Sequence, residues 1–174
     1  MPGSAPAPPE RCWLLPSVEV RRSTIEGRGL FATEPVAAGS VVGRLGGRLV
    51  DGAELGRLLA AAELSASYVD TITVLPDLHL VLPGRQPIGY GNHSCDPTLW
   101  HVDAYTLAAR RDIAAGEEVT VDYATQTAEA GFTMACRCGS GLCRGTVTGD
   151  DWRRPELQRR YGDHWVPAVL LLGR

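Results

Sequence analysis

Four of the five cysteines constrain this chain more than any other feature of its sequence. Three stand close together, as Cys136, Cys138 and Cys143, and Cys95 lies in residues 92–97, which read NHSCDP. Cys136 and Cys138 are too close in the chain to bridge each other comfortably, whereas structural zinc takes four ligands of this kind. The alternative reading is a set of buried apolar thiols, which would not need the Cys-x-Cys-x4-Cys spacing. We therefore expect a zinc site that pins the C-terminal segment onto the centre of the fold.

Length and composition indicate a folded domain. The chain has 174 residues, of which 44% are hydrophobic, enough for one domain with a core. The apolar residues 12–15 are too few for a secretory signal, and the apolar run 166–172 is far too short to span a bilayer. We expect a cytoplasmic protein with no membrane partner, where reducing conditions favour metal binding over disulfides. Cys12 would then be a free thiol.

Charge gives a weaker indication about partners. The net charge is −3 and the isoelectric point is near 5.8, which argues against direct nucleic-acid binding because such proteins usually carry a basic surplus. The same balance is compatible with a cationic substrate. All 17 basic residues are arginines, a bias that we attribute to base composition of the gene. The sequence does not indicate an oligomeric state.

The order of predicted elements favours a mainly β fold. Residues 1–17 are predicted to be a disordered, proline-rich leader, residues 18–126 one domain, and residues 127–174 a segment with the cysteine run and a last helix. Short strands with few helices argue against a nucleotide-binding α/β sheet. Strands are predicted within residues 18–23, 29–33, 40–45, 68–82, 105–113 and 117–124.

Two helices are predicted from their caps and apolar spacing. Asp51 is a candidate cap for a helix whose apolar face holds Leu55, Leu58, Leu59 and Ala62. A last helix is expected to start at Asp150 or Asp151 and to run through Tyr161, although Pro155 falls in its first turns.

Four segments, in this order, resemble those of a known family. They are residues 26–31 (EGRGLF), residues 92–97, residues 111–123 (RDIAAGEEVTVDY) and the cysteine run through Arg144 and Gly145. Together they resemble a SET-domain protein, of a small bacterial type, with a post-SET zinc segment. The resemblance covers about residues 18–145. It implies a β-clip fold with a few short helices, in which the C-terminal part threads through the domain as a pseudoknot.

The resemblance also implies a cofactor and the residues that meet it. The family consists largely of S-adenosylmethionine-dependent protein lysine methyltransferases. The turn Gly27-Arg28-Gly29 would lie against the methionine moiety of the cofactor, although such a turn is also explained by a need for positive φ. Asn92 and His93 would meet the cofactor, with His93 mainly structural. Trp152 and Phe132 flank the cysteine run, and each is a candidate for covering the adenine or for ordinary core packing.

Two tyrosines are candidates for the methyl-transfer site. Tyr123, placed at the end of a predicted strand, matches the family tyrosine whose hydroxyl lies close to the reacting groups. Tyr68 is a candidate for the second wall of the lysine channel, and a core tyrosine is an equal reading of it. The sequence departs from the family pattern at Thr98, at Ala124 and at residues 89–91, and the last departure leaves the surroundings of the cofactor open. The short insert between Asp51 and Tyr68 leaves the substrate open, because in the family this insert often helps to choose the peptide.

The sequence therefore predicts a methyltransferase that uses S-adenosylmethionine, carries a structural zinc ion and modifies a protein or peptide lysine. Two alternatives stay open. One is methylation of a small-molecule amine on the same fold, and the other is a non-catalytic, zinc-stapled binding module. The presence of Tyr123 beside the glycine turn and the Asn92 segment favours an enzyme over a binding module.

Overall fold

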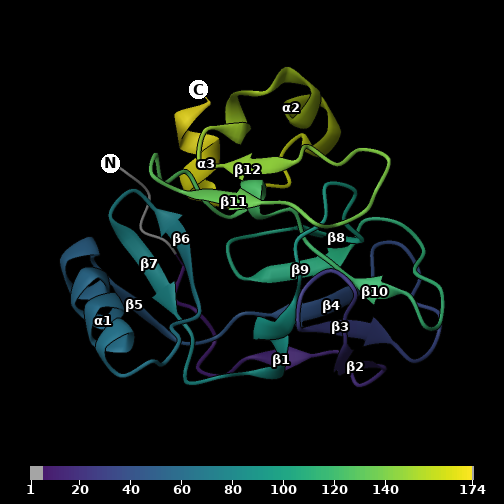
Figure 1. Cartoon of the computed structure of the whole chain (residues 1–174), viewed down its shortest axis with the longest axis horizontal. Helices are drawn as coiled ribbons and strands as arrows, with labels where there is room; N and C mark the ends of the chain where they lie inside the picture. Colours follow the sequence, from purple (N-terminus) through teal and green to yellow (C-terminus); the bar gives the residue numbers. More distant parts are fainter. Residues whose placement is uncertain (1–5, 174) are drawn as a thin grey trace.

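Short antiparallel strands make up most of the structure, a computed structural model that describes residues 6–173 (Figure 1). The largest sheet has the strand order β1-β4-β9-β8, and a three-stranded sheet has the order β10-β3-β2. The strands of the first sheet are β1 (Trp13–Leu14), β4 (Val41–Arg44), β9 (Thr106–Ala109) and β8 (Leu99–His101). Those of the second are β10 (Glu118–Val119), β3 (Arg28–Ala32) and β2 (Val18–Arg22). The mainly β prediction is thus confirmed.

The hairpin of β2 and β3 forms where the sequence predicts it. Val18 pairs with Ala32 and Arg22 with Arg28, so the turn between the strands contains Gly27. Gly27 has a φ of 44°, a left-handed conformation that glycine adopts without the steric cost of a side chain. The conformation of the turn therefore depends on the backbone freedom of Gly27. Its position near β10 follows from the pairing of β3 with that strand.

A third sheet and one long helix form a separate edge of the molecule (Figure 1). The sheet has the order β5-β7-β6, with β5 (Arg48–Val50), β6 (Thr71–Leu75) and β7 (Leu78–Val81). Helix α1 (Gly52–Leu64) begins after Asp51, whose side chain accepts a hydrogen bond from the Glu54 amide at 2.7 Å, as the predicted cap requires. Leu55 and Ala62 are buried, but Leu59 is 46% exposed, so the buried face of the helix is narrower than predicted.

Residues 92–94 pair in parallel with the strand-like segment that follows β10. His93 forms a parallel bridge with Val121, the Ser94 amide donates to the Val121 carbonyl at 3.1 Å, and the Val121 amide donates to the Asn92 carbonyl at 3.1 Å. This pairing places the Asn92 segment beside the chain that leads to Tyr123. Regular strand ends at Val119, however, and Tyr123 lies in a short 3-10 helix, η2 (Tyr123–Thr125). The prediction that Tyr123 lies at the end of a strand is therefore wrong, because the strand ends four residues earlier, at Val119.

The C-terminal segment packs as a small layer above the sheets (Figure 1). It contains the hairpin of β11 (Thr133–Ala135) and β12 (Thr146–Thr148), then η3 (Asp151–Arg153), α2 (Pro155–Tyr161) and α3 (Pro167–Leu172). Both α-helices start at a proline, which is favourable because the first helical position has no hydrogen bond for its amide to lose. The predicted last helix is thus divided at Pro155, and α3 was not predicted. The elements pack in a second apolar cluster of Ala124, Leu157, Tyr161, Trp165, Val166, Ala168 and Val169.

The described part of the expected leader packs against the sheets, so the prediction of disorder through residue 17 does not hold there. β1 pairs with β4, the Pro6 carbonyl accepts from the Tyr105 hydroxyl at 2.7 Å, and the Gly47 amide donates to the Pro9 carbonyl at 3.0 Å. Proline-rich chain lacks amide donors, but its carbonyls still accept, and these contacts order it. Residues 1–5 lie outside the described range.

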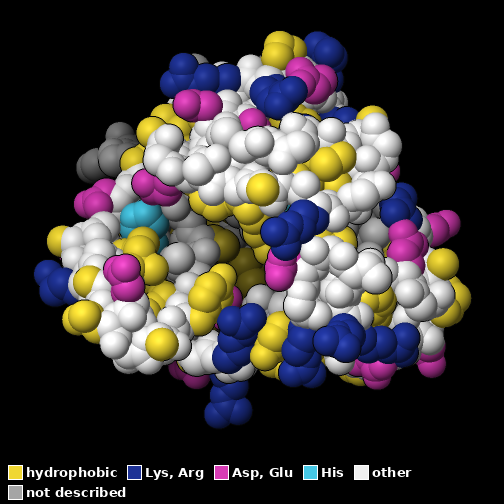
Figure 2. All heavy atoms as spheres, in the orientation of Figure 1, with side chains coloured by type: hydrophobic (Ala, Val, Ile, Leu, Met, Phe, Trp, Pro, Cys, Tyr) yellow, Lys and Arg dark blue, Asp and Glu magenta, His cyan; other side chains and the backbone are white. Residues whose placement is uncertain are grey.

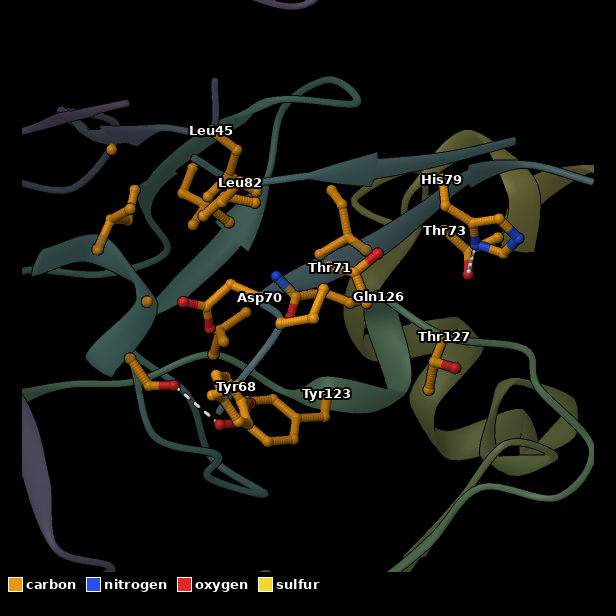
Figure 3. Close-up of a pocket in the computed structure, with 18 of the residues that line it drawn as sticks. Leu45, Tyr68, Asp70, Thr71, Thr73, His79, Leu82, Tyr123, Gln126 and Thr127 are labelled. Carbon is orange, nitrogen blue, oxygen red and sulfur yellow. Dashed lines mark hydrogen bonds between the residues drawn. The ribbon is translucent and has the colours of Figure 1, made fainter. Parts of the chain in front are cut away.

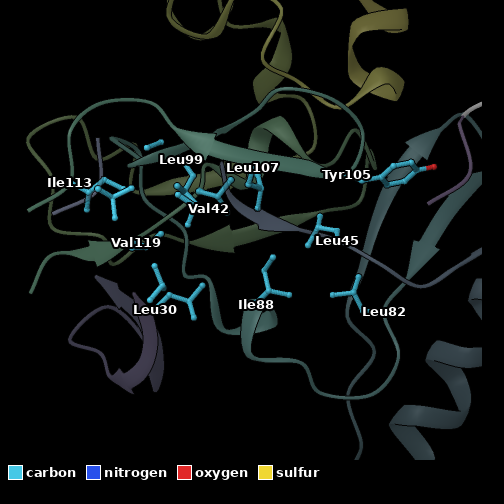
Figure 4. Packing of buried hydrophobic residues seen from close by; sticks show 14 of the residues in the cluster. Leu30, Val42, Leu45, Leu82, Ile88, Leu99, Tyr105, Leu107, Ile113 and Val119 are labelled. Carbon is cyan, nitrogen blue, oxygen red and sulfur yellow. The ribbon is translucent and has the colours of Figure 1, made fainter. Parts of the chain in front are cut away.

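The main core lies between the sheets, where Leu30, Val42, Leu107, Ile113 and Val119 converge (Figure 4). These side chains are at most 5% exposed. Loop Pro87–Tyr90, a 3-10 turn called η1, sends Ile88 into the same core. The core therefore fixes η1 and the Asn92 segment that follows it. Within residues 6–173, none of the helices has the length and apolar character needed to cross a membrane.

A buried charged network joins the C-terminal layer to the sheet region. Arg144 donates two hydrogen bonds to the Asp122 carboxylate, each at 2.7 Å, and one to Asp151 at 2.9 Å. The Tyr161 hydroxyl donates to Asp122 at 2.8 Å. Asp122 is fully buried and the Arg144 side chain is 5% exposed. A buried charge is tolerated when it is paired and hydrogen-bonded, and Asp122 meets both conditions.

We expect Tyr161→Phe to lower the free energy of unfolding by about 1.5–3 kcal/mol, because the lost hydrogen bond reaches a buried carboxylate. Tyr105→Phe is the matched control, since the Tyr105 hydroxyl donates to a neutral carbonyl; its expected loss is about 0.5–1.5 kcal/mol. Urea unfolding followed by circular dichroism measures both. Equal losses would mean that the charge of Asp122 adds nothing to the Tyr161 contact.

Candidate functional site

The structure brings together the four cysteines that the sequence singles out. The sulfur atoms of Cys95, Cys136, Cys138 and Cys143 all lie within 4.8 Å of one another, and those of Cys95 and Cys136 are 3.7 Å apart. Four thiolates around a tetrahedral metal, with metal–sulfur bonds of about 2.3 Å, have sulfur–sulfur distances of about 3.8 Å. The four cysteines can therefore hold a metal ion, and all four are free of disulfides.

Main-chain and side-chain donors support the sulfur of Cys95. The Arg144 amide donates to it at 3.3 Å, and His93 Nε2 lies 3.4 Å from it. Burial lowers the pKa of His93 to about 4, so the ring is neutral. Its Nδ1 accepts a hydrogen bond from the Tyr123 amide at 3.1 Å, which leaves the proton on Nε2, facing the sulfur. His93 thus links the cysteine cluster to the main chain of Tyr123.

Two cavities meet at Tyr123. The larger cavity, about 570 Å³, opens between α1, the β6 strand and the C-terminal layer, and hydrophobic side chains line the hollow in Figure 2. Its wall includes Tyr68, Asp70, Gly91, Tyr123 and Gln126 (Figure 3). The smaller cavity, about 210 Å³, has Tyr123 in its lining too. One side chain thus borders two separate spaces, an arrangement suited to two molecules that meet at Tyr123.

The Tyr123 hydroxyl is held in a defined orientation. It donates a hydrogen bond to the Gly91 carbonyl at 2.9 Å, so its oxygen lone pairs remain free to accept from a ligand. Burial raises the pKa of Tyr123 to about 12, and the charges of Tyr68 and Asp70 add to the shift. The phenol therefore stays protonated at any physiological pH. A fixed, neutral hydroxyl of this kind can position an amine without itself ionising.

Tyr68 lines the same cavity but stands at its mouth. Its side chain is 68% exposed, and in Figure 3 its ring lies beside that of Tyr123. The Arg85 guanidinium sits over the Tyr68 ring at 4.6 Å and over the Tyr90 ring at 4.4 Å from the centroids, distances at which a cation is attracted to the ring face. The exposure of Tyr68 excludes the reading as an ordinary core tyrosine.

The glycine turn reaches the smaller cavity through its neighbours and through Asn92. Ile25 and Glu26, which precede the turn, line that cavity together with Asn92 and His93. The Asn92 side-chain amide donates to the carbonyls of Glu26 and Arg28, at 3.2 and 3.1 Å, and to Glu118 at 2.8 Å. Asn92 therefore fixes the turn against β10. Residues 27–29 themselves do not line the cavity.

Gly29 is required by packing. A Cβ atom built at Gly29 would overlap the Glu118 carboxylate and would lie 2.9 Å from Asn92 Nδ2. The backbone of Gly29 does not have a positive φ, so the requirement comes from this close approach and not from the turn conformation. Gly27 supplies the left-handed conformation, and an added Cβ there would meet nothing within 4 Å.

The smaller cavity also holds two opposite charges that sequence reasoning missed. Arg137 donates to the Glu26 carboxylate at 3.0 Å, and both residues line the cavity. The two side chains are about 70% exposed, so the pair contributes little to stability and can open at little cost. A motif search cannot find it, because the partners come together only when the cysteine segment folds over the glycine turn.

The two aromatic candidates for the cofactor site, Phe132 and Trp152, lie in different parts of the structure, and neither lines the smaller cavity. Phe132 lines the larger cavity and not the smaller one. Trp152 lines neither cavity and packs against the second apolar cluster. Met134 and Ala135, in β11, are instead the hydrophobic residues of the C-terminal layer that border the smaller cavity. The sequence carries no signal for Met134, because a half-buried methionine in a short strand is common.

Comparison with known proteins supports the resemblance that the four sequence segments indicate. The family model described as SET domain matches residues 27–124. The chain is 28% identical over 154 residues to histone-lysine N-methyltransferase ash1 of Drosophila melanogaster, covering 83% of this chain and 7% of that protein. It is 29% identical to the H3 lysine-4 specific histone-lysine N-methyltransferase of Yarrowia lipolytica and to histone-lysine N-methyltransferase 2B of Homo sapiens. Each match covers 74% of this chain, and 12% and 5% of those proteins. The chain thus spans a small part of these curated relatives.

Proposed function

Because this chain belongs to the SET-domain family, we propose that it transfers a methyl group from S-adenosylmethionine to the amine of a protein lysine. The observation that carries the proposal is the position of Tyr123, which lines both cavities. Three relatives are histone-lysine N-methyltransferases by name, which supports a protein lysine as the acceptor. The larger cavity takes the lysine side chain, and the smaller cavity takes the methionine end of the methyl donor.

The residues of the smaller cavity fit the methyl donor. Its methionine end carries an ammonium and a carboxylate, and Glu26 and Arg137 offer one opposite charge for each. Asn92 lines this cavity and holds the main chain of the turn beside it by donating to the carbonyls of Glu26 and Arg28. The exposed Glu26–Arg137 ion pair opens at little cost, so Glu26 can pair with the ammonium of the ligand and Arg137 with its carboxylate.

The chemistry asks little of the protein beyond alignment. When bound, S-adenosylmethionine supplies an activated methyl group: the amine lone pair forms the new carbon–nitrogen bond, the electrons of the carbon–sulfur bond stay on sulfur, and the product releases a proton. Tyr123, bound to the Gly91 carbonyl, accepts an N–H of the amine and directs its lone pair. The apolar wall of the cavity removes water and lowers the pKa of the lysine amine. Alignment of this kind supplies much of the acceleration.

We also propose that the ion at the four cysteines is zinc. Four thiolates at tetrahedral spacing, with no open position for a substrate, are typical of structural zinc. The ion would hold the segment that carries Arg137 against residues 92–95, and so would complete the smaller cavity. This proposal makes cofactor binding depend on the metal.

Tyr123→Phe should lower methyl transfer by at least about tenfold, equal to roughly 1.4 kcal/mol of barrier, because it removes a contact that matters most in the transition state. Single-turnover transfer to the lysine substrate, with the number of methyl groups read by mass spectrometry, measures the effect. Cofactor affinity should change little. Tyr105→Phe, away from both cavities, is the control. Equal rates and equal product ratios would remove Tyr123 from the mechanism.

Gly29→Val should abolish binding of S-adenosylmethionine, because the new side chain displaces Asn92 and Glu118 and with them the turn. Isothermal titration calorimetry with S-adenosylmethionine or its demethylated product measures it. Gly56→Val is a matched control, since an added Cβ at Gly56 in α1 meets nothing within 4 Å. Normal affinity in the Gly29 variant would mean that the cofactor site lies elsewhere.

Elemental analysis of protein purified without chelators should give one zinc ion per chain. Cys138→Ser should lose the metal, loosen the C-terminal segment and weaken cofactor binding, because structural zinc contributes directly to folding. Cys12→Ser is the control, since Cys12 lies outside the cluster and contacts Gly46. A metal-free protein that is fully folded and binds cofactor normally would contradict the zinc proposal.

A further inference from the structure

An acidic side chain lines the larger cavity next to the two tyrosines. Asp70 precedes β6 and is only partly exposed. Figure 3 shows its carboxylate on the cavity wall in the region of Tyr68 and Tyr123. The charge of Asp70 contributes to raising the pKa of both tyrosines, which means that its field reaches their hydroxyls. A negative charge thus faces the space where we place the substrate side chain.

The Asp70 carboxylate has no partner among residues 6–173. Neither a side-chain hydrogen bond nor an ion pair within 4.0 Å is formed by it there, whereas the buried carboxylates of Asp122 and Asp151 are both paired with Arg144. Burial raises the pKa of Asp70, and Arg85 opposes the shift. Arg85 is close enough to act on Asp70 but is engaged with the rings of Tyr68 and Tyr90. Among residues 6–173, the cost of partly burying this charge is therefore offset by Arg85 alone, and without direct contact.

The main chain of η1 is shaped to admit the carboxylate. Gly89 lies directly beside it: a Cβ built at Gly89 would lie 2.6 Å from Asp70 Oδ2 and 2.9 Å from its carboxyl carbon. The absence of a side chain at Gly89 thus allows Asp70 to rest against η1. Two residues later, the Gly91 carbonyl accepts from the Tyr123 hydroxyl. Asp70 and Tyr123 are in this way set against one short stretch of backbone.

We infer that Asp70 is a substrate-recognition residue, whose carboxylate binds the positively charged amine of the lysine as it enters the larger cavity. The inference rests on the proposed function and adds a specificity determinant to it. Tyr68 and Tyr123 offer ring faces and hydroxyls to the same cation, and Asp70 supplies the full opposite charge. A carboxylate stabilises the protonated amine and raises its pKa, against the effect of the apolar wall, so Asp70 acts on capture of the side chain before the proton is lost. Its removal should therefore raise KM without lowering kcat.

The test compares two peptides of the H3 lysine-4 region, one with lysine and one with norleucine, an uncharged residue of similar shape. Binding of each is measured by calorimetry with the demethylated cofactor present, so that no transfer occurs. We expect Asp70→Asn to reduce the preference for lysine over norleucine by about tenfold or more, with norleucine affinity nearly unchanged. Methyl transfer should show a raised KM with kcat little changed.

Two further variants separate local charge from general effects. Gly89→Ala keeps the charge but displaces the carboxylate, and should reduce the lysine preference in the same direction. Asp163→Asn removes one exposed carboxylate elsewhere on the surface and should leave the preference as in the wild type. Melting temperatures and cofactor affinity, measured in parallel, identify any variant that is merely misfolded.

The outcomes distinguish this inference from the proposed function. If the lysine peptide is methylated but Asp70→Asn weakens both peptides equally, or neither, the inference is overturned and methyl transfer stands. A wild-type protein without any preference for lysine over norleucine also overturns it. Labelled methyl transfer to the H3 peptide and to a cell extract tests the proposed function on its own; absence of transfer from a cofactor-bound protein counts against that function.

Discussion

The pairing of Arg144 with Asp122 is the constraint on which the site depends. Arg144 directly follows the last cysteine of the cluster, and Asp122 directly precedes Tyr123. Their two hydrogen bonds join positions 22 residues apart in the chain, inside a region where neither charge meets water. Removing one partner of such a pair costs about 3–5 kcal/mol. The C-terminal layer therefore cannot leave the sheets without also releasing the segment that carries Tyr123.

His93 provides a second connection along the same route. It faces Cys95 with one ring nitrogen and the Tyr123 amide with the other. The cysteine cluster and the candidate catalytic tyrosine are thus connected twice, once through a neutral ring and once through an ion pair. These buried polar contacts explain how a chain of short strands can hold the Tyr123 segment in place.

Much of the fold could be predicted from local sequence. The β2–β3 hairpin, the Asp51 cap and the helix after it follow from turn chemistry, capping and apolar spacing, each of which acts over a few residues. The errors also have local causes. Tyr123 was expected at a strand end, but the chain leaves the strand at Val119 to pair with residues 92–94. The expected leader is ordered because its carbonyls find donors on residues far along the chain, such as Tyr105.

The sequence by itself determined the family, and it identified the cysteines as candidate metal ligands and Tyr123 as the candidate catalytic residue. The cysteine spacing, the glycine turn and the tyrosine after Asp122 are readable because each is a short pattern in one stretch of chain. Only the tertiary structure decided that Asp70 lies against Gly89, that Glu26 meets Arg137, and that Trp152 belongs to the second apolar cluster. These relations depend on how separate segments pack, and single residues carry no local mark of the partner they will meet.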